Sequence, residues 1–159
     1  MTQAPPVTIR AGRAGDAGAL ARLVAVTVRF SNAYEYTDAG RTQIARLYGA
    51  ASLGRSLAGG RVRVAEDARG IAGFVTTARR ERAISVEALF VHPDAQGRGI
   101  GAALLEAGVA AAAPDEGAEP PRVTVLSSLT AEGFYARAGF ERLRTVRRPY
   151  GAAILMSRS

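Results

Sequence analysis

The stretch ISVEALFVHPDAQGRGIGAALLEAGVAAAA, residues 84–113, decides the fold of this chain. Its opening run, Ile84 to Val91, carries apolar residues on both faces, which predicts a strand buried on both sides near the centre of a sheet. Pro93 ends this strand because proline has no N–H to give to a neighbouring strand. Beyond a glycine-rich turn, apolar residues recur at helical spacing and predict a helix whose inner side holds Ile100, Leu104, Ala107 and Ala111.

The turn between the strand and the helix, Gln96 to Gly101, has the properties of an anion site. The first turn of a helix leaves N–H groups without partners and carries the positive end of the helix dipole. Glycines let a diphosphate approach this backbone without a Cβ in the way, and Arg98 adds a positive charge. The alternative is a glycine-rich connection that binds nothing.

Two well-known phosphate loops do not fit this turn. The dinucleotide fingerprint needs GxGxxG, whereas Gly97, Gly99 and Gly101 give GxGxG. The P-loop needs a lysine, and the chain contains none. The pattern that fits is Gln-x-x-Gly-x-Gly, preceded by LFVHPDA. It resembles the acetyl-CoA signature of the GNAT superfamily of N-acetyltransferases, and this resemblance implies a loop whose amides hold the coenzyme A diphosphate.

The resemblance also implies which residues contact acetyl-CoA. In that fold the central strand and the next parallel strand splay apart, and the pantetheine arm of the coenzyme enters the gap. The coenzyme-binding residues expected from the resemblance are Leu89, Phe90, Val91, Gln96, Gly97, Arg98, Gly99, Ile100 and Gly101.

A second stretch, SSLTAEGFYARAGF at residues 127–140, matches a further part of the family pattern. On a helix, Ala131, Phe134 and Tyr135 fall on one face, and a pair of core aromatics is the plain reading. Family members carry Asn-x-x-Ala-x-x-x-Tyr here, with the tyrosine beside the coenzyme sulfur. The resemblance therefore implies Tyr135 as a catalytic residue, and Ser128 as a pantetheine contact in the place of the usual asparagine.

Glu87 is a candidate general base. On a regular strand it shares a face with Leu89 and Val91, while Val86, Ala88 and Phe90 share the other. A carboxylate at this place could take a proton from an incoming ammonium group, directly or through water. A buried glutamate paired with an arginine is an equally good interpretation.

Composition sets limits on function. The chain has 159 residues, so residues 1–159 are expected to form a single domain with a flexible tail at 1–6. There is no cysteine and one histidine, which argues against thiol chemistry and a metal site. No run is apolar enough to span a membrane and no signal-peptide core is present, so a cytoplasmic location is the expectation.

All 21 basic residues are arginine, and the net charge is +7. Such a positive field would speed encounters with a polyanion such as coenzyme A. The arginine clusters at 79–82 and 142–148 are not interleaved with aromatic residues and are not on a helix that could enter a groove, so nucleic-acid binding is a minor alternative.

The expected element order, βααβββαβαββ, does not alternate strictly, which argues against a fully parallel doubly wound sheet. The fold class is α/β (α+β), with a mixed, mostly antiparallel central sheet flanked by helices, as in the GNAT fold. The second helix is expected over residues 42–57 as one piece, with Ile44, Leu47, Tyr48 and Ala51 on its buried side. The resemblance to the GNAT family implies that the loop before it, residues 31–40, borders the acceptor site.

These features predict an N-acetyltransferase that moves the acetyl group of acetyl-CoA to a primary amine by direct attack in a ternary complex. A non-catalytic acyl-CoA binding or sensing module is the alternative, since it would need the same loop without turnover. The acceptor is expected to be a small-molecule or peptide amine. A homodimer built through the C-terminal strands is also expected.

Overall fold

The computed structural model describes residues 6–31, 37–114, 119–148 and 151–159. Most of the expected tail and the loop residues Tyr34 to Tyr36 lie outside these ranges. The strands of the described residues are β1 (Thr8–Ala11), β2 (Val62–Asp67), β3 (Gly70–Arg80), β4 (Ala83–Val91), β5 (Arg122–Ser127), β6 (Glu141–Arg148) and β7 (Gly151–Arg158). The helices are α1 (Ala17–Ser31), α2 (Asp38–Leu47), α3 (Ala50–Ala58), α4 (Ile100–Ala112) and α5 (Glu132–Arg137), with short 3-10 turns η1 (Ala14–Asp16) and η2 (Pro93–Ala95).

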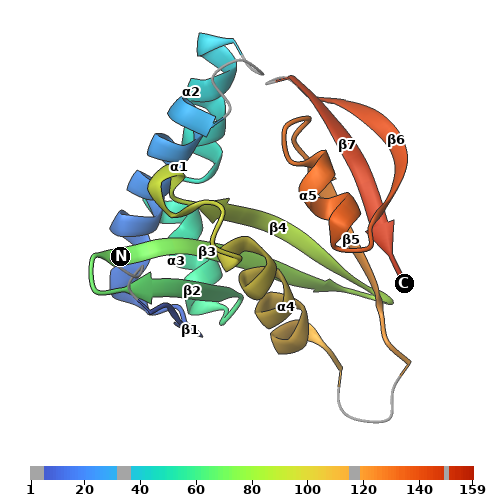
Figure 1. Ribbon diagram of the computed structural model, residues 1–159, viewed down its shortest axis with the longest axis horizontal. Coiled ribbons are helices and arrows are strands. Elements are labelled where there is room, and N and C mark those ends of the chain that lie inside the picture. Colours follow the sequence, from blue (N-terminus) through green and yellow to red (C-terminus); the bar gives the residue numbers. More distant parts are fainter. Residues whose placement is uncertain (1–5, 32–36, 115–118, 149–150) are drawn as a thin grey trace.

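These strands form one sheet in the order β1-β2-β3-β4-β5-β7-β6 (Figure 1). Every neighbouring pair is antiparallel except β4 and β5, which run parallel because α4 crosses between them. The strand over residues 84–91 is therefore at the centre of the sheet, as predicted. The mixed, mostly antiparallel sheet flanked by helices is confirmed.

Helices cover both faces of the sheet. On one face α1 packs against α2, α3 and the middle strands, with Leu20, Val24 and Val28 buried at the spacing of one helix side. On the other face α4 packs on β3 and β4, and α5 completes the same apolar cluster through Tyr135. Each layer thus buries the apolar residues of the sheet face that it covers.

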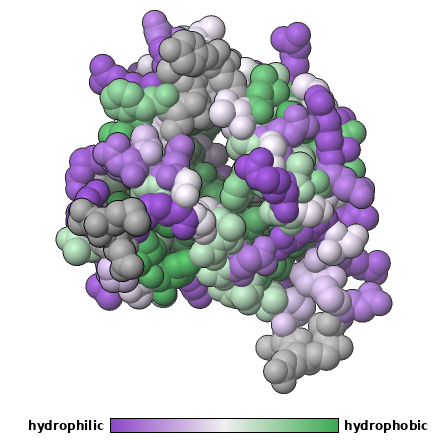
Figure 2. All heavy atoms as spheres, in the orientation of Figure 1, coloured by the Kyte–Doolittle hydropathy of each residue, from purple (hydrophilic) through white to green (hydrophobic). Residues whose placement is uncertain are grey.

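The buried side of α4 differs from the one expected. Ile100 and Leu104 are buried as predicted, but Leu105 and Gly108 complete the stripe and Ala111 is exposed. A Cβ at Gly108 would lie 2.9 Å from Val75 Cγ1, so glycine there lets the helix lie close to β3. Outward residues such as Ala102 and Ala103 make the α4 surface weakly hydrophobic (Figure 2).

The single helix expected over residues 42–57 is wrong. The structure has two helices, because α2 ends at the non-helical Tyr48 (φ −109°, ψ 38°) and Gly49 begins α3 as its N-cap. The break changes the phase of the apolar residues, so Leu53 and Leu57 are buried while Leu47 and Ala51 are exposed. Glycine inside a helical pattern was the signal for this break.

A β-bulge interrupts β4 at Glu87. Thr76 pairs with Ala88 and Thr77 with Val86, which leaves Glu87 as the extra residue of β4. The expected alternation therefore fails: Val86 packs in the α4 cluster, whereas Ala88 and Phe90 pack in the α1–α3 cluster. The bulge shifts the register of residues 88–91, the outer half of β4, by one residue relative to residues 83–86, its inner half.

Candidate active site

Two central strands part next to the bulge. The pairing of β4 with β5 runs from Ala83 and Arg122 to Val86 and Val125, and no pair beyond these is found in the described chain. Figure 1 shows β4 and β5 leaving one corner of the sheet and then diverging. The open edge of β4 begins at Glu87, the bulge residue.

The outer half of β4 directs its backbone groups alternately to β3 and to this gap. The His92 N–H, just beyond the strand, donates to the carbonyl of Ala72 on β3 at 2.7 Å. Every second residue of β4 counted back from His92, such as Phe90, therefore directs its N–H and C=O groups to β3. The backbone groups of Leu89 and Val91 face the gap. An amide chain lying in the gap could pair with these groups as a further strand would.

The glycine loop joins the end of β4 to α4. Gly97 (φ +80°) and Gly99 (φ +76°) both have left-handed backbone conformations that favour glycine. A Cβ at either residue would meet no atom within 4 Å, so their outer side is open. Gly99 is the N-cap of α4 and has no side chain to bind the first N–H groups of the helix. The loop can therefore receive an anion.

Two side chains of the loop bind protein groups. The Arg98 guanidinium lies 3.5 Å from the carboxylate of Asp67, whose side chain is only 5% exposed at the end of β2. The Gln96 Nε2 donates to the Val91 carbonyl at 3.2 Å and ties the loop to the strand end. The contact between Asp67 and Arg98 was not predictable from the sequence, because the two residues are 31 positions apart.

Gly101 is a glycine for a different reason than Gly97 and Gly99. Its φ is not positive, but a Cβ there would lie 3.2 Å from the Phe134 ring. Glycine thus allows α5 to pack against the first turn of α4. Phe134 in turn contacts Tyr135 edge to face at 5.0 Å. This packing joins the glycine loop to α5, the helix that carries Tyr135.

Tyr135 lies in the apolar cluster against which Leu89 and Val91 of β4 also pack. Its side chain is 5% exposed and its ring also meets Phe140 edge to face at 5.4 Å. Burial raises the pKa of Tyr135 well above its usual value, and the nearby phenol of Tyr48 raises this pKa further. The hydroxyl therefore stays protonated at neutral pH and is able to donate a hydrogen bond.

Glu87 is paired with an arginine. The Arg80 guanidinium donates to the Glu87 carboxylate at 2.9 Å, and the Glu87 side chain is about one third exposed. The Glu87 carbonyl accepts a hydrogen bond from the Tyr48 hydroxyl at 3.2 Å. Tyr48 was expected only as a core residue, so sequence reasoning missed its contact with the bulge.

Ser128 has a structural bond of its own. Its Oγ accepts from the Ala131 N–H at 3.2 Å in the turn before α5. The neighbouring Ser127, almost fully buried, donates to the Ser128 carbonyl at 2.7 Å. A serine hydroxyl that accepts this bond keeps its own proton to donate, so the contact expected for Ser128 is compatible with the turn.

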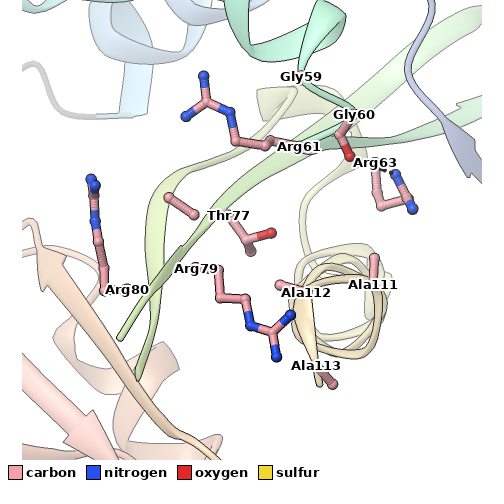
Figure 3. Close-up of a pocket in the computed structure, with 11 residues that line it drawn as sticks. Gly59, Gly60, Arg61, Arg63, Thr77, Arg79, Arg80, Ala111, Ala112 and Ala113 are labelled. Carbon is pink, nitrogen blue, oxygen red and sulfur yellow. Dashed lines mark hydrogen bonds between the residues drawn. The ribbon is translucent and has the colours of Figure 1, made fainter. Parts of the chain in front are cut away.

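A groove of about 450 Å³ lies at the other end of α4, away from the glycine loop. It is lined by the ends of α3, β3 and α4 and by Arg61, Arg63, Arg79 and Arg80. Figure 3 shows these four guanidinium groups pointing in different directions. Arg63 donates to the Val62 and Gly60 carbonyls after α3, where the helix dipole is negative. We assign Arg61, Arg63 and Arg79 to the surface and the helix end, whereas Arg80 pairs with Glu87.

The part of the chain that the structure describes contains no cluster of His, Asp and Glu side chains that could hold a metal ion. The same residues include no helix long and apolar enough to cross a membrane.

Known proteins resemble the chain in sequence and in fold. A search of curated proteins found no match. PaiA N-acetyltransferase from Thermoplasma acidophilum, solved with coenzyme A, superposes with a TM-score of 0.80 at 16% identity, over 97% of this chain and 99% of its own. A GCN5-related N-acetyltransferase from Rhodopseudomonas palustris gives 0.76 at 25% identity, over 100% and 98%. The yncA protein of Salmonella typhimurium, a putative acetyltransferase solved with acetyl-CoA, gives 0.62 at 18% identity, over 95% and 92%.

The family model of the acetyltransferase (GNAT) domain matches residues 32–154, which is most of the chain. This range contains the diverging strands, the glycine loop and Tyr135. The expected resemblance is therefore confirmed, and the chain belongs to the GNAT family of acetyltransferases.

Proposed function

We propose that this protein transfers the acetyl group of acetyl-CoA to a primary amine of a small molecule or peptide. The observation that carries the proposal is the divergence of β4 and β5 next to the glycine loop, whose helix α4 packs through Gly101 against Phe134, the neighbour of Tyr135. Solved structures of similar fold contain coenzyme A or acetyl-CoA, which supports this cosubstrate.

The coenzyme would be held by the loop and the open edge of β4. Its diphosphate would meet the first N–H groups of α4 and the open sides of Gly97 and Gly99, because Gly99 offers no side-chain cap and a Cβ at either glycine would meet no atom within 4 Å. Arg98 would add charge while Asp67 fixes its direction. The pantetheine amides would pair with the backbone of Leu89 and Val91, and Ser128 would donate to the same arm.

The amine would attack the thioester directly, in a complex that holds both substrates. Proximity supplies much of the rate in such a reaction, so no covalent enzyme intermediate is needed. Backbone N–H groups on the open edge of β4 would stabilise the charge that develops on the thioester oxygen. Glu87 would accept the proton of the amine, with Arg80 orienting its carboxylate.

The Tyr135 hydroxyl would donate a hydrogen bond to the departing sulfur. Burial raises the pKa of Tyr135, which by itself makes the phenol a weaker acid. The same dry surroundings also raise the basicity of a thiolate formed beside it, so the two effects oppose each other. The hydrogen bond from Tyr135 would therefore strengthen as the C–S bond breaks and negative charge develops on the sulfur.

The test is a thiol-release assay with acetyl-CoA across a panel of small amines, amino acids and peptides. Release that depends on an amine supports the proposal. Coenzyme binding by calorimetry with no turnover on any amine would instead support an acyl-CoA sensing module.

The same assay on Glu87→Gln tests the proposed general base. An unchanged kcat would mean that Glu87 only pairs with Arg80. The cytoplasmic location stays a prediction.

A further inference from the structure

Tyr48 occupies an unusual place between two helices. It follows the last residue of α2 with a non-helical backbone, and Gly49 then begins α3. Its ring meets Phe90 edge to face at 5.3 Å, and Phe90 stacks on the fully buried Phe74 at 5.6 Å. These contacts fix the ring, and with it the direction of the hydroxyl.

That hydroxyl donates to the carbonyl of Glu87 at 3.2 Å. Glu87 is the extra residue of the β4 bulge, and a bulge residue stands outside the regular ladder. The β4–β5 pairing also ends one residue earlier, at Val86. A side chain on another element therefore binds the backbone at the point where the two strands part.

The bulge decides where the outer half of β4 directs its backbone groups. A shift of one residue there would exchange the edge that faces β3 and the edge that faces the gap. Tyr48 packs with the α1–α3 cluster and Tyr135 with the α4 cluster, so the two phenols belong to opposite faces of the sheet. The Tyr48 phenol also raises the pKa of Tyr135.

We propose that Tyr48 is a positioning residue for acetyl transfer, whose hydroxyl holds the Glu87 bulge and so aims the N–H groups of the open β4 edge at the thioester. This inference rests on the proposed function, because it assigns the open edge to the acetyl group. Tyr48 itself touches the strand and acts through it.

The experiment compares Tyr48→Phe with Ile44→Val. Tyr48→Phe keeps the ring contacts and removes only the hydroxyl, whereas Ile44→Val removes one buried methylene group from the same apolar cluster. We expect kcat of Tyr48→Phe to fall roughly 10- to 100-fold, the effect of a small misplacement at a reacting centre. The KM for acetyl-CoA should change less than about threefold, because the glycine loop is unaltered. Ile44→Val should keep kcat and KM near the wild-type values, even if its Tm falls as far as that of Tyr48→Phe.

A second measurement is independent of turnover. Hydrogen exchange of peptides that cover residues 86–91 should be faster in Tyr48→Phe than in wild type, and unchanged in Ile44→Val. Unaltered exchange at this segment overturns the inference, whether or not any amine is acetylated. A wild-type kcat in Tyr48→Phe overturns it too, as does an equal loss in both variants. Failure of the proposed function would instead appear as a wild-type protein without amine-dependent thiol release.

Discussion

Tyr135 combines deep burial with a hydroxyl that no described residue binds, and the two properties can be tested with one substitution. Tyr135→Phe keeps the ring against Phe134 and Phe140 and removes only the hydroxyl. If Tyr135 assists the departing sulfur, kcat should fall roughly 10²–10⁴-fold with little change in the KM for acetyl-CoA. If a folded variant has the wild-type kcat in an assay where chemistry limits the rate, Tyr135 has only a packing role in the core.

The same variant has a signature in alkali. The folded pKa of Tyr135 is raised, so above about pH 10 the unfolded chain loses this proton while the folded chain keeps it. Its contribution to stability is present below that pH and is lost as the pH rises towards the folded pKa. Wild type should therefore lose more Tm than Tyr135→Phe between pH 8 and pH 11. Parallel losses would contradict the burial of the phenol.

Gly99 and Gly60 form a matched pair for testing the loop. Both have left-handed backbones, with φ +76° and +69°, and both face open space where a Cβ would stand. Gly99→Asp places a carboxylate where the diphosphate is expected and should weaken coenzyme A binding by at least tenfold in calorimetry. Gly60→Asp carries the same backbone strain at the other end of the molecule and should bind as wild type does. Equal affinities in the two variants would remove the loop from the coenzyme site.

Single residues were predictable where chemistry is local. The glycines at 97 and 99 were predicted to leave room for a diphosphate, and in the structure a Cβ at either position would meet no atom within 4 Å. The partners of Arg98 and Glu87 were not predictable as specific residues, because Asp67 is brought to Arg98, and Arg80 to Glu87, only by strand pairing. A long-range ion pair leaves no periodic signal in the sequence.

Helices and strands show the same division between local and distant causes. The strand at 84–91 and the helix after it were predicted because proline, glycine and apolar spacing act locally. The division of residues 42–57 into α2 and α3 was missed, although Gly49 was visible in the sequence. The bulge at Glu87 could not be predicted, since it is a mismatch between two strands and belongs to neither sequence alone.

Arg10 ties three elements of the N-terminal half together. From β1 it donates to Asp16 at the end of η1 and to Glu66 on β2, at 2.9–3.1 Å. Hydrogen bonds from Arg10 lower the pKa of both carboxyl groups below their usual values. A lowered folded pKa gives stability that is present at neutral pH and is lost as the pH falls through it.

Arg10→Gln should therefore lower Tm by roughly 3–8 °C at pH 7, because two carboxylates lose their cationic donor. The difference from wild type should shrink as the pH falls below about 4, since the lowered pKa values mean that this stability is lost as the two carboxyl groups become protonated. Arg55→Gln is the control, because it removes the same charge from an exposed side chain of α3 that is not among the causes of either pKa shift. A Tm difference that is independent of pH would assign the effect of Arg10 to packing.

The whole molecule carries a net charge of +7, and β6 concentrates part of it at the edge of the sheet. Arginines stand at positions 142, 144, 147 and 148, and nearly every residue of this strand is exposed. An unpaired edge strand offers its N–H and C=O groups to another chain, while charged side chains along it oppose such pairing. The homodimer predicted from the sequence would have to overcome this opposition.

Salt decides between the ways in which two copies could join. Pairing of two β6 edges about a two-fold axis would bring like-charged arginine side chains together. The Debye length falls from about 10 Å at 0.1 M to about 3 Å at 1 M, so added salt screens their repulsion. We therefore expect light scattering to show a homodimer whose dissociation constant decreases between 0.1 and 1 M NaCl. A dimer that weakens with salt would be held by opposite charges elsewhere, and a monomer at every salt and protein concentration would contradict the dimer itself.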